Sequence, residues 1–355
     1  MRKVLQSGIF GFSFFMVLFF FMSHFAYAQN QSSNQVDVKI VTDEADAVLS
    51  IRQKLVKGEE VIEADWKQLF ESEGYIRLKK REAAIKHPFT DAEFKTFILS
   101  DSSANKRDAL QKTLREWKST DINETAKKSL AYLPSGAKIK AKIYPVIKIK
   151  TNSFVFETDI DPAIFLYIDP LKPREEFENT LAHELHHIGY SASCKSERDA
   201  AEAAQTGNAK TVYYWIGAFG EGFAMLAAAG GPDIHPHLYS KMEDRERWDH
   251  DVSNFNEEQQ KVVDFFSGIL ENRYDENKTN EIGSSFFGIQ GPWYTVGWKM
   301  AMVIEKIYGR SVLIECICDQ RKLLPTYNKA VKEYNKQNQE SNNQWPDSII
   351  NAVNN

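Results

Sequence analysis

One stretch of this sequence decides how the rest of the chain is understood: Pro173-Arg-Glu-Glu-Phe-Glu-Asn-Thr-Leu-Ala-His-Glu-Leu-His-His-Ile-Gly189. Pro173 suits the first position of a helix, and the glutamates that follow it complement the positive end of the helix dipole. Gly189 suits the position just past the last turn. The stretch therefore predicts a helix of about four turns between Pro173 and Gly189.

At about 100° per residue, this helix has an apolar face and a polar face beside it. The apolar face consists of Phe177, Leu181, Leu185 and Ile188, and the polar face carries Thr180, His183, Glu184 and His187. The polar face has the H-E-x-x-H spacing, in which two imidazoles one turn apart can hold a single Zn²⁺. The carboxylate beside the first imidazole can take the proton of an attacking water. The face predicts hydrolysis of a peptide bond, although a chance occurrence of the motif is the alternative.

The predicted roles are zinc ligand for His183 and His187, and general base for Glu184. His186 lies to the side of the metal face, so we expect a supporting or surface group there. Catalytic zinc usually has a third protein ligand. A metzincin would require glycine at 190 and histidine at 193, but the chain has Tyr190 and Ser193 there. A carboxylate from a later helix is what remains.

Two carboxylates compete for the role of third ligand. Glu221 lies in Gly220-Glu-Gly-Phe-Ala-Met-Leu-Ala-Ala-Ala-Gly230, where small residues allow close helix packing, and thirty-three residues separate it from His187. Only fourteen residues separate Glu202 from His187, and Arg198 offers Glu202 an ion pair one helical turn away. Glu221 is therefore the predicted ligand, and Glu202 is the alternative.

The order His183-Glu-Leu-His-His187 and then Glu221-Gly-Phe-Ala224 resembles the gluzincin arrangement. It is similar in particular to a family of secreted bacterial zinc-dependent peptidases. The likeness extends from about residue 70 to about residue 330 and includes three flanking segments: Tyr132-Leu-Pro134, Ile164-Phe-Leu-Tyr167 and Gly291-Pro-Trp-Tyr294. The resemblance implies one zinc ion per chain and a zincin-like metallopeptidase fold. It implies nothing about which peptide or protein is the substrate.

The N-terminus has the features of an export signal. Arg2 and Lys3 precede an apolar core from about residue 8 to residue 22, and Ala26-Tyr-Ala28 suits a cleavage site. We expect cleavage after Ala28 and a periplasmic or extracellular location, with an uncleaved membrane anchor as the alternative. Loss of the two basic residues changes the net charge from −5 to −7, so nothing indicates nucleic-acid binding.

The chain divides into four predicted regions: the signal at 1–28, a helical region at 29–133, a zincin-like catalytic region at 134–335 and a loosely ordered polar tail at 336–355. Thr90-Asp-Ala-Glu93 suits a capping box in the helical region. Residues 137–143 alternate apolar and charged, and residues 153–156 and 163–168 are rich in strand formers. The expected fold is mainly α with a small β-sheet (α+β). The 163–168 strand is either an edge that pairs with substrate or an ordinary core strand.

Further residues complete the predicted site. A helix at 291–309 carries Tyr294, a candidate donor to the oxyanion, although a tyrosine in such a helix is usually a core residue. His235, His237 and His250 are weaker candidates for that role, in a loop that we expect to be solvated. A polar loop is expected between 271 and 289. Cys194, Cys316 and Cys318 allow at most one intramolecular bridge, and the last two cannot easily face each other.

Other functional classes fit the same sequence. The chain could be a non-catalytic envelope protein that keeps zinc for structure, or an anchored protein whose N-terminal half recruits partners. Zinc content, loss of activity on chelation and the N-terminus of the exported product would distinguish these classes. The sequence does not determine the cleavage preference or the oligomeric state.

Overall fold

The computed structural model describes residues 35–100, 106–150 and 152–354. The predicted signal at 1–28 lies outside these residues. Within the described part of the chain, no helix has both the length and the apolar character needed to cross a membrane.

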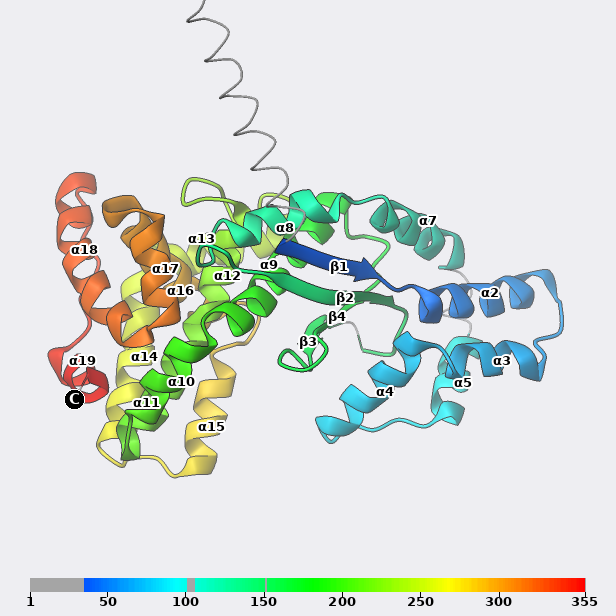
Figure 1. Ribbon diagram of the computed structural model, residues 1–355, viewed down its shortest axis with the longest axis horizontal. Helices are drawn as coiled ribbons and strands as arrows, with labels where there is room; N and C mark the ends of the chain where they lie inside the picture. Colours follow the sequence, from blue (N-terminus) through cyan, green and yellow to red (C-terminus); the bar gives the residue numbers. More distant parts are fainter. Residues whose placement is uncertain (1–34, 101–105, 151, 355) are drawn as a thin grey trace, which may run out of the picture.

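Short helices form the N-terminal end of the molecule, as the sequence predicts (Figure 1). They are α2 (Asp43–Lys57), α3 (Glu63–Phe70), α4 (Glu73–Ala84), α5 (Asp91–Leu99), α7 (Arg107–Lys118) and α8 (Ile122–Leu130). The predicted capping box starts α5: the Thr90 hydroxyl accepts from the Glu93 amide at 3.2 Å, and the Glu93 carboxylate accepts from the Thr90 amide at 2.6 Å.

Four strands form one mixed sheet in the order β1-β2-β4-β3. The strands are β1 (Val36–Ile40), β2 (Ile139–Val146), β3 (Phe154–Phe156) and β4 (Ala163–Tyr167). β1 and β4 pair in parallel with β2, and β3 runs antiparallel to β4. The predicted alternation in β2 is confirmed, because Ile139, Ala141 and Ile143 are buried. β1 is an addition that the sequence did not indicate.

β4 is an interior strand, so the prediction that it forms a substrate-binding edge is wrong. It pairs with β2 on one side and, over residues 163–165, with β3 on the other, so it lies inside the sheet and is not its edge. Residues 163–166 are completely buried, as expected for a core strand. The short strand β3 takes the edge position instead, because the chain folds back before β4 begins.

The predicted metal helix is α9 (Arg174–Ser193), and its apolar stripe packs as expected. Phe177 is buried and stacks on Trp117 with ring centroids 4.2 Å apart. Pro173 caps the helix, which continues four residues past Gly189, so the predicted helix end is wrong. A Cβ on Gly189 would lie 2.3 Å from Leu133 Cδ1. Gly189 therefore allows close packing and does not end the helix.

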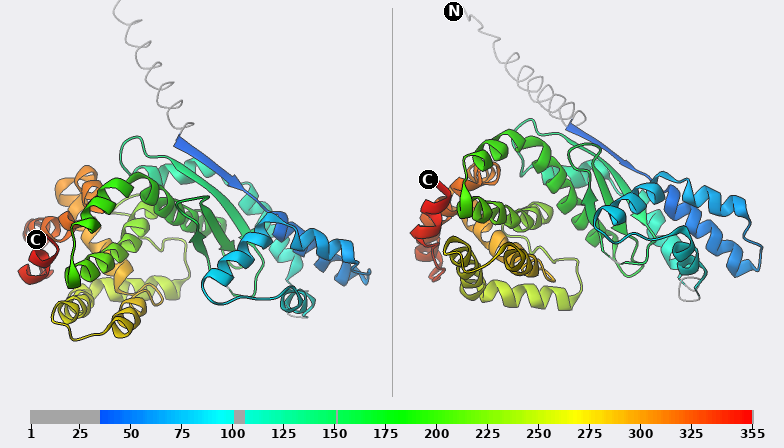
Figure 2. Two further views of the ribbon diagram at one scale, coloured as in Figure 1. Left: turned by 60° about the horizontal axis from the view of Figure 1, so that its bottom comes forward. Right: turned by 90° about the horizontal axis from the view of Figure 1, so that it is seen from below.

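Helices form the whole C-terminal half after α9 (Figure 2). They are α10 (Lys195–Ala203), α11 (Gly207–Ile216), η1 (Gly217–Phe219), α12 (Gly220–Ala229), α13 (Met242–Ser253), α14 (Phe255–Leu270), α15 (Glu276–Ser285), α16 (Pro292–Tyr308), α17 (Arg310–Cys318), η2 (Gln320–Lys322), α18 (Leu323–Asn338) and α19 (Asp347–Asn354). Pro292 is at the first helical position of α16, as predicted.

Three expectations for this half are wrong. The segment expected to be a loop through His250 becomes helix α13 from Met242 onward. The segment expected to be a polar loop contains α15, whose N-terminus is capped by Asp275. The tail expected to be loosely ordered ends in α19, and Trp345, Ile349 and Val353 are buried there. Their spacing of four residues gives this short segment one apolar stripe, which outweighs its polar composition.

Two large groups of buried apolar residues result, in a molecule that is mainly helical with a small mixed sheet. The first core joins the N-terminal helices, one face of the sheet and the apolar stripe of α9. The second core joins Tyr132 with residues of α10 to α19. Tyr190, near the end of α9, packs against both cores. The metal helix therefore lies where the two cores meet.

Candidate metal centre

α9 places His183 and His187 side by side, with their Nε2 atoms 3.0 Å apart. The helix is held in place next to this pair, because the buried Ser129 hydroxyl of α8 donates to the carbonyl of Ala182 at 2.6 Å. Both imidazoles are mostly buried, with 13% and 20% of their side chains exposed. The helical spacing read from the sequence thus produces the expected pair.

Glu221 reaches the same point from α12, in the second half of the molecule. Its Oε2 lies 3.1 Å from His183 Nε2 and 3.3 Å from His187 Nε2. α12 lies close against α16 because Gly222 has no side chain: a Cβ there would lie 2.1 Å from the Trp298 amide nitrogen. Gly220, which the sequence also assigned to close packing, faces open space, so that part of the expectation is wrong.

These three side chains fit the requirements of a zinc site. Ligand atoms bound to one tetrahedral zinc at 2.0–2.1 Å lie about 3.3 Å from one another. The three distances here are 3.0, 3.1 and 3.3 Å, and two imidazole nitrogens with one carboxylate oxygen are ligands that zinc accepts. Among the described residues, this is the one group of three or more potential ligands close enough to hold a metal ion.

The charges at the centre favour a cation. Burial lowers the pKa of His187, but the carboxylates of Glu221 and Glu184 outweigh burial and raise that pKa to about 9. Burial raises the pKa of Glu221, but the imidazoles of His187 and His183 hold it well below its usual value. The raised pKa of His187 and the lowered pKa of Glu221 have one cause: the carboxylates and the imidazoles are close enough to stabilise each other's charged forms. A metal ion would compete with protons for this place.

Glu184 follows His183 on the same face of α9 and is half-buried. Burial raises the pKa of its carboxyl group, while the neighbouring imidazoles of His183 and His187 oppose the rise. A carboxylate with a raised pKa is a better proton acceptor than an exposed one. Its position and environment suit the predicted general base.

Tyr294 comes to the centre from the first turn of α16. Its ring lies nearly parallel to that of His183, with centroids 6.3 Å apart. Burial raises the pKa of its hydroxyl, and the nearby carboxylate of Glu221, which it contacts, raises it further. The hydroxyl therefore stays protonated and can donate a hydrogen bond.

Glu202 lies apart from the three clustered ligands. It is exposed and forms an ion pair with Lys210 at 3.4 Å, and its expected pair with Arg198 is absent among the ion pairs of the described residues. The other histidine candidates also have different neighbours. His235 bonds to Asp249 at 2.8 Å, and His237 to Ser240 at 3.0 Å.

His250 is exposed next to Asp251, so its exposure is as expected, although it lies in helix α13 and not in a loop. His237 departs from that expectation, because only 4% of it is exposed. His186 is likewise buried, so of the two roles expected for it the surface role is excluded. Burial, followed by repulsion from His187, lowers the pKa of His186 to about 3.

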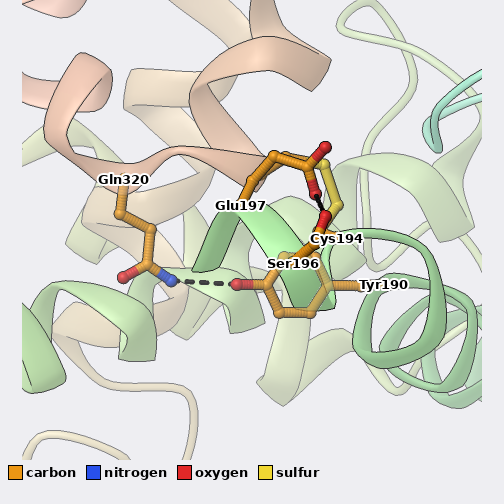
Figure 3. Close-up of a disulfide and its surroundings, with 6 residues drawn as sticks. Tyr190, Cys194, Ser196, Glu197 and Gln320 are labelled. Carbon is orange, nitrogen blue, oxygen red and sulfur yellow. Dashed lines mark hydrogen bonds between the residues drawn. A yellow bond between two sulfur atoms is a disulfide. The ribbon is translucent and has the colours of Figure 1, made fainter. Parts of the chain in front are cut away.

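A cleft of about 510 Å³ opens beside the centre, and sequence reasoning did not identify it. His187 and Glu221 line it together with Tyr190, Arg198, Tyr213 and Gln320. A bridge between Cys194 and Cys318 joins the end of α9 to α17 next to these residues (Figure 3). Cys316 is free and buried. Three cysteines allow one bridge, as expected, but the sequence does not show whether Cys194 pairs with Cys316 or with Cys318.

A family model described as "Putative zinc dependent peptidase (DUF5700)" matches residues 56–336. The match includes the metal centre and Tyr294. No curated protein and no solved structure matches the chain.

Proposed function

We propose that this chain, which belongs to the family described as "Putative zinc dependent peptidase", hydrolyses peptide bonds with one bound zinc ion. The observation that carries the proposal is the mutual approach of His183, His187 and Glu221 to within 3.0–3.3 Å, with Glu184 on the same helix face. Two of these ligands come from the H-E-x-x-H helix and the third from a later helix, which supports a gluzincin-type assignment and a zincin-like fold.

In this proposal His183, His187 and Glu221 hold the metal. A zinc ion bound there would supply a Lewis acid that acidifies water and polarises the scissile carbonyl. Glu184 accepts the proton of the attacking water and afterwards gives it to the leaving amine. Its partly buried carboxyl group, with a raised pKa, supports both transfers.

Tyr294 is proposed to donate a hydrogen bond to the oxygen that becomes negative during the attack. Its hydroxyl is held protonated by burial and by Glu221, so it remains a donor at neutral and alkaline pH. Such donors typically contribute about 3 kcal/mol to the transition state. The ring of Tyr294 lies nearly parallel to that of the proposed metal ligand His183, so the tyrosine lies at the proposed reaction centre.

We also propose export with cleavage after Ala28, and two features support it. The first is the basic start, apolar core and Ala-x-Ala ending of the N-terminus. The second is the Cys194–Cys318 bridge, because disulfides persist mainly in oxidising compartments. Sequencing the N-terminus of protein recovered outside the cytoplasm tests the proposal, with Gln29 expected as the first residue.

The test of the catalytic proposal combines metal analysis with digestion of an unbiased peptide pool. Mature protein should contain about one zinc per chain and should lose hydrolysis when a chelator removes the metal. Glu184→Gln keeps the size of the side chain but removes the base, so zinc should remain while hydrolysis falls by ~10² or more. Near-full activity of that variant with zinc bound would exclude Glu184 as the base. Unfolding on zinc removal, without hydrolysis by the zinc-loaded protein, would instead indicate a structural metal.

A further inference from the structure

We propose that the cleft beside the metal centre binds the free C-terminal carboxylate of a short peptide, with Arg198 and Tyr190 as its receptor. This inference rests on the proposed peptidase function and specifies its substrate class: peptides cleaved near a free C-terminus. The cleft is lined by two metal-centre residues, His187 and Glu221, and by Arg198. Its volume of about 510 Å³ falls within the range of about 300–1,000 Å³ that small-ligand sites occupy.

Arg198 is the cation that lines this cleft. Its guanidinium lies over the ring of Tyr190, 5.6 Å from the centroid, and 24% of its side chain is exposed. Among the described residues its ion-pair partner is Asp199, whose carboxylate oxygen is 3.8 Å from Nε. This long contact leaves the forked guanidinium able to bind a carboxylate through two parallel hydrogen bonds.

Tyr190 supplies the second donor. It lies one turn after His187 on α9 and so faces the same cleft. Its hydroxyl oxygen accepts a hydrogen bond from Gln320 Nε2 at 3.0 Å. Because that bond uses an oxygen lone pair, the hydroxyl proton is left to donate to an incoming carboxylate.

The disulfide holds these groups in place. Cys194 lies four residues before Arg198, and Cys318 lies two residues before Gln320. The bridge therefore joins the two turns that carry the arginine and the glutamine, and Figure 3 shows Tyr190 and Gln320 bonded next to it. A rigid corner of this kind lowers the entropic cost of binding a small ligand.

Tyr213 indicates that a polar ligand completes this cleft. It lines the cleft, is 2% exposed, and its hydroxyl has no hydrogen-bond partner among the described residues. Buried hydroxyls are normally bonded. Glu202 also lines the cleft and could instead attract a peptide ammonium group, but its pairing with Lys210 offsets that charge. The carboxylate is therefore the terminus that the cleft favours.

The experiment measures binding separately from hydrolysis. Zinc-loaded Glu184→Gln protein is dialysed against one pool of tetrapeptides in three forms: free acids, C-terminal amides and N-acetylated acids. Retained peptides are quantified by mass spectrometry. The acids should bind ~10- to 100-fold more tightly than the amides, because an ionic hydrogen-bonded pair is lost in the amide. N-acetylation should change binding little.

Arg198→Gln in the same background should remove the difference between acid and amide, and Arg198→Lys should leave part of it. Lys195→Gln is the matched control, since Lys195 is on the same helix and pairs with Asp199 outside the cleft lining. Zinc content and unfolding temperature should stay at the parental values in all three. A difference that persists in Arg198→Gln would place the carboxylate elsewhere, for example on the metal, and would overturn the proposal.

Hydrolysis of the same pool by the wild-type chain separates this inference from the peptidase proposal. Preferential cleavage of the acids, weakened by Arg198→Gln, supports both. Equal binding and equal cleavage of acids and amides would leave the peptidase standing and overturn the carboxylate site. Arg198-dependent binding of acids without any cleavage would support the carboxylate site and overturn the peptidase proposal.

Discussion

The two cores of this molecule contribute differently to the metal centre. The first core contains the sheet and supports α9, so it supplies His183, Glu184 and His187 on one rigid helix. The second core is built mainly from helices and is rich in aromatic rings, and it supplies Glu221 from α12 and Tyr294 from α16. One core thus carries a local motif, while the other carries single residues that are far apart in the sequence.

The geometry of the centre therefore depends on how the two cores are joined. Contacts at the end of α9 are part of this junction. Tyr190 packs on both cores, and the Cys194–Cys318 bridge ties the end of α9 to α17. A change that shifts α12 or α16 should therefore damage the centre even when the H-E-x-x-H helix is intact.

The largest effect is expected from removing the ligand that the second core supplies. Glu221→Ala leaves two imidazoles, which is too few for tight zinc binding, so zinc stoichiometry and hydrolysis should both fall to background. Glu202→Ala is the matched control, because this exposed carboxylate pairs with Lys210. It should keep about one zinc per chain. The opposite pattern would make Glu202 the third ligand, and full zinc in both variants would exclude both residues.

Tyr294→Phe tests the other contribution of the second core. It removes only the hydroxyl, so zinc should stay bound while kcat falls by about 10²-fold, the typical effect of losing one oxyanion donor. Tyr308→Phe at the far end of the same helix is the control, since Tyr308 is 43% exposed. Steady-state kinetics with a peptide substrate gives both values. An unchanged kcat in Tyr294→Phe would show that the hydroxyl does not act on the oxyanion and that Tyr294 is an ordinary packing residue.

Gly222→Ala tests the junction between α12 and α16. The new methyl would lie 2.1 Å from a backbone nitrogen of α16, so the helices must separate. We expect a loss of about 3 kcal/mol in the free energy of unfolding, together with weaker zinc binding through the adjacent Glu221. Gly220→Ala should cost nothing comparable, because open space surrounds that position. Equal urea midpoints for the two variants would contradict the close-packing argument.

The features that could be predicted from the sequence are those that depend on local sequence, as in the helix that the first core supports. The apolar stripe and metal face of α9 depend on helical period alone, so they were found without tertiary information. Chain length and small neighbours predict Glu221 as the third ligand, and its carboxylate lies beside both histidines. Of its two flanking glycines, only Gly222 has the packing role. The alternation in β2 was equally clear from local sequence.

The features that were missed depend on long-range pairing. β4 looks like an edge strand only until β3 folds against it, and Gly189 looks like a helix end only until Leu133 packs on it. Tyr190 and Gln320 are 130 residues apart in the sequence, and they form a hydrogen bond next to the Cys194–Cys318 bridge. No local pattern contains such information, since it arises from the docking of the two cores.

The smallest expected effect is a difference in how the cores respond to acid. Burial, followed by repulsion from His235, lowers the pKa of His237 to about 4. The unfolded chain, with a pKa near 6.5, binds the proton first, so stability falls as the pH drops from about 6.5 toward about 4. The contribution is about 2 kcal/mol at pH 5. In the first core, burial raises the pKa of Glu44 to about 8, which acts in the opposite direction: stability falls as the pH rises between about 4.5 and 8.

His237 and Glu44 change the stability of the protein in opposite directions with pH, so their effects partly cancel in the free energy of unfolding of the wild type. The difference in that free energy between a variant and the wild type isolates one group. His237→Phe keeps a ring against Trp248, whose centroid is 5.0 Å away, and removes the titrating group. The free energy of unfolding of this variant, relative to wild type, should therefore rise by about 2 kcal/mol between pH 7 and pH 5. His250→Phe is the control, because His250 is exposed and has no burial to lose. A pH-independent difference for His237→Phe would show that this imidazole takes up its proton equally in the folded and unfolded chain.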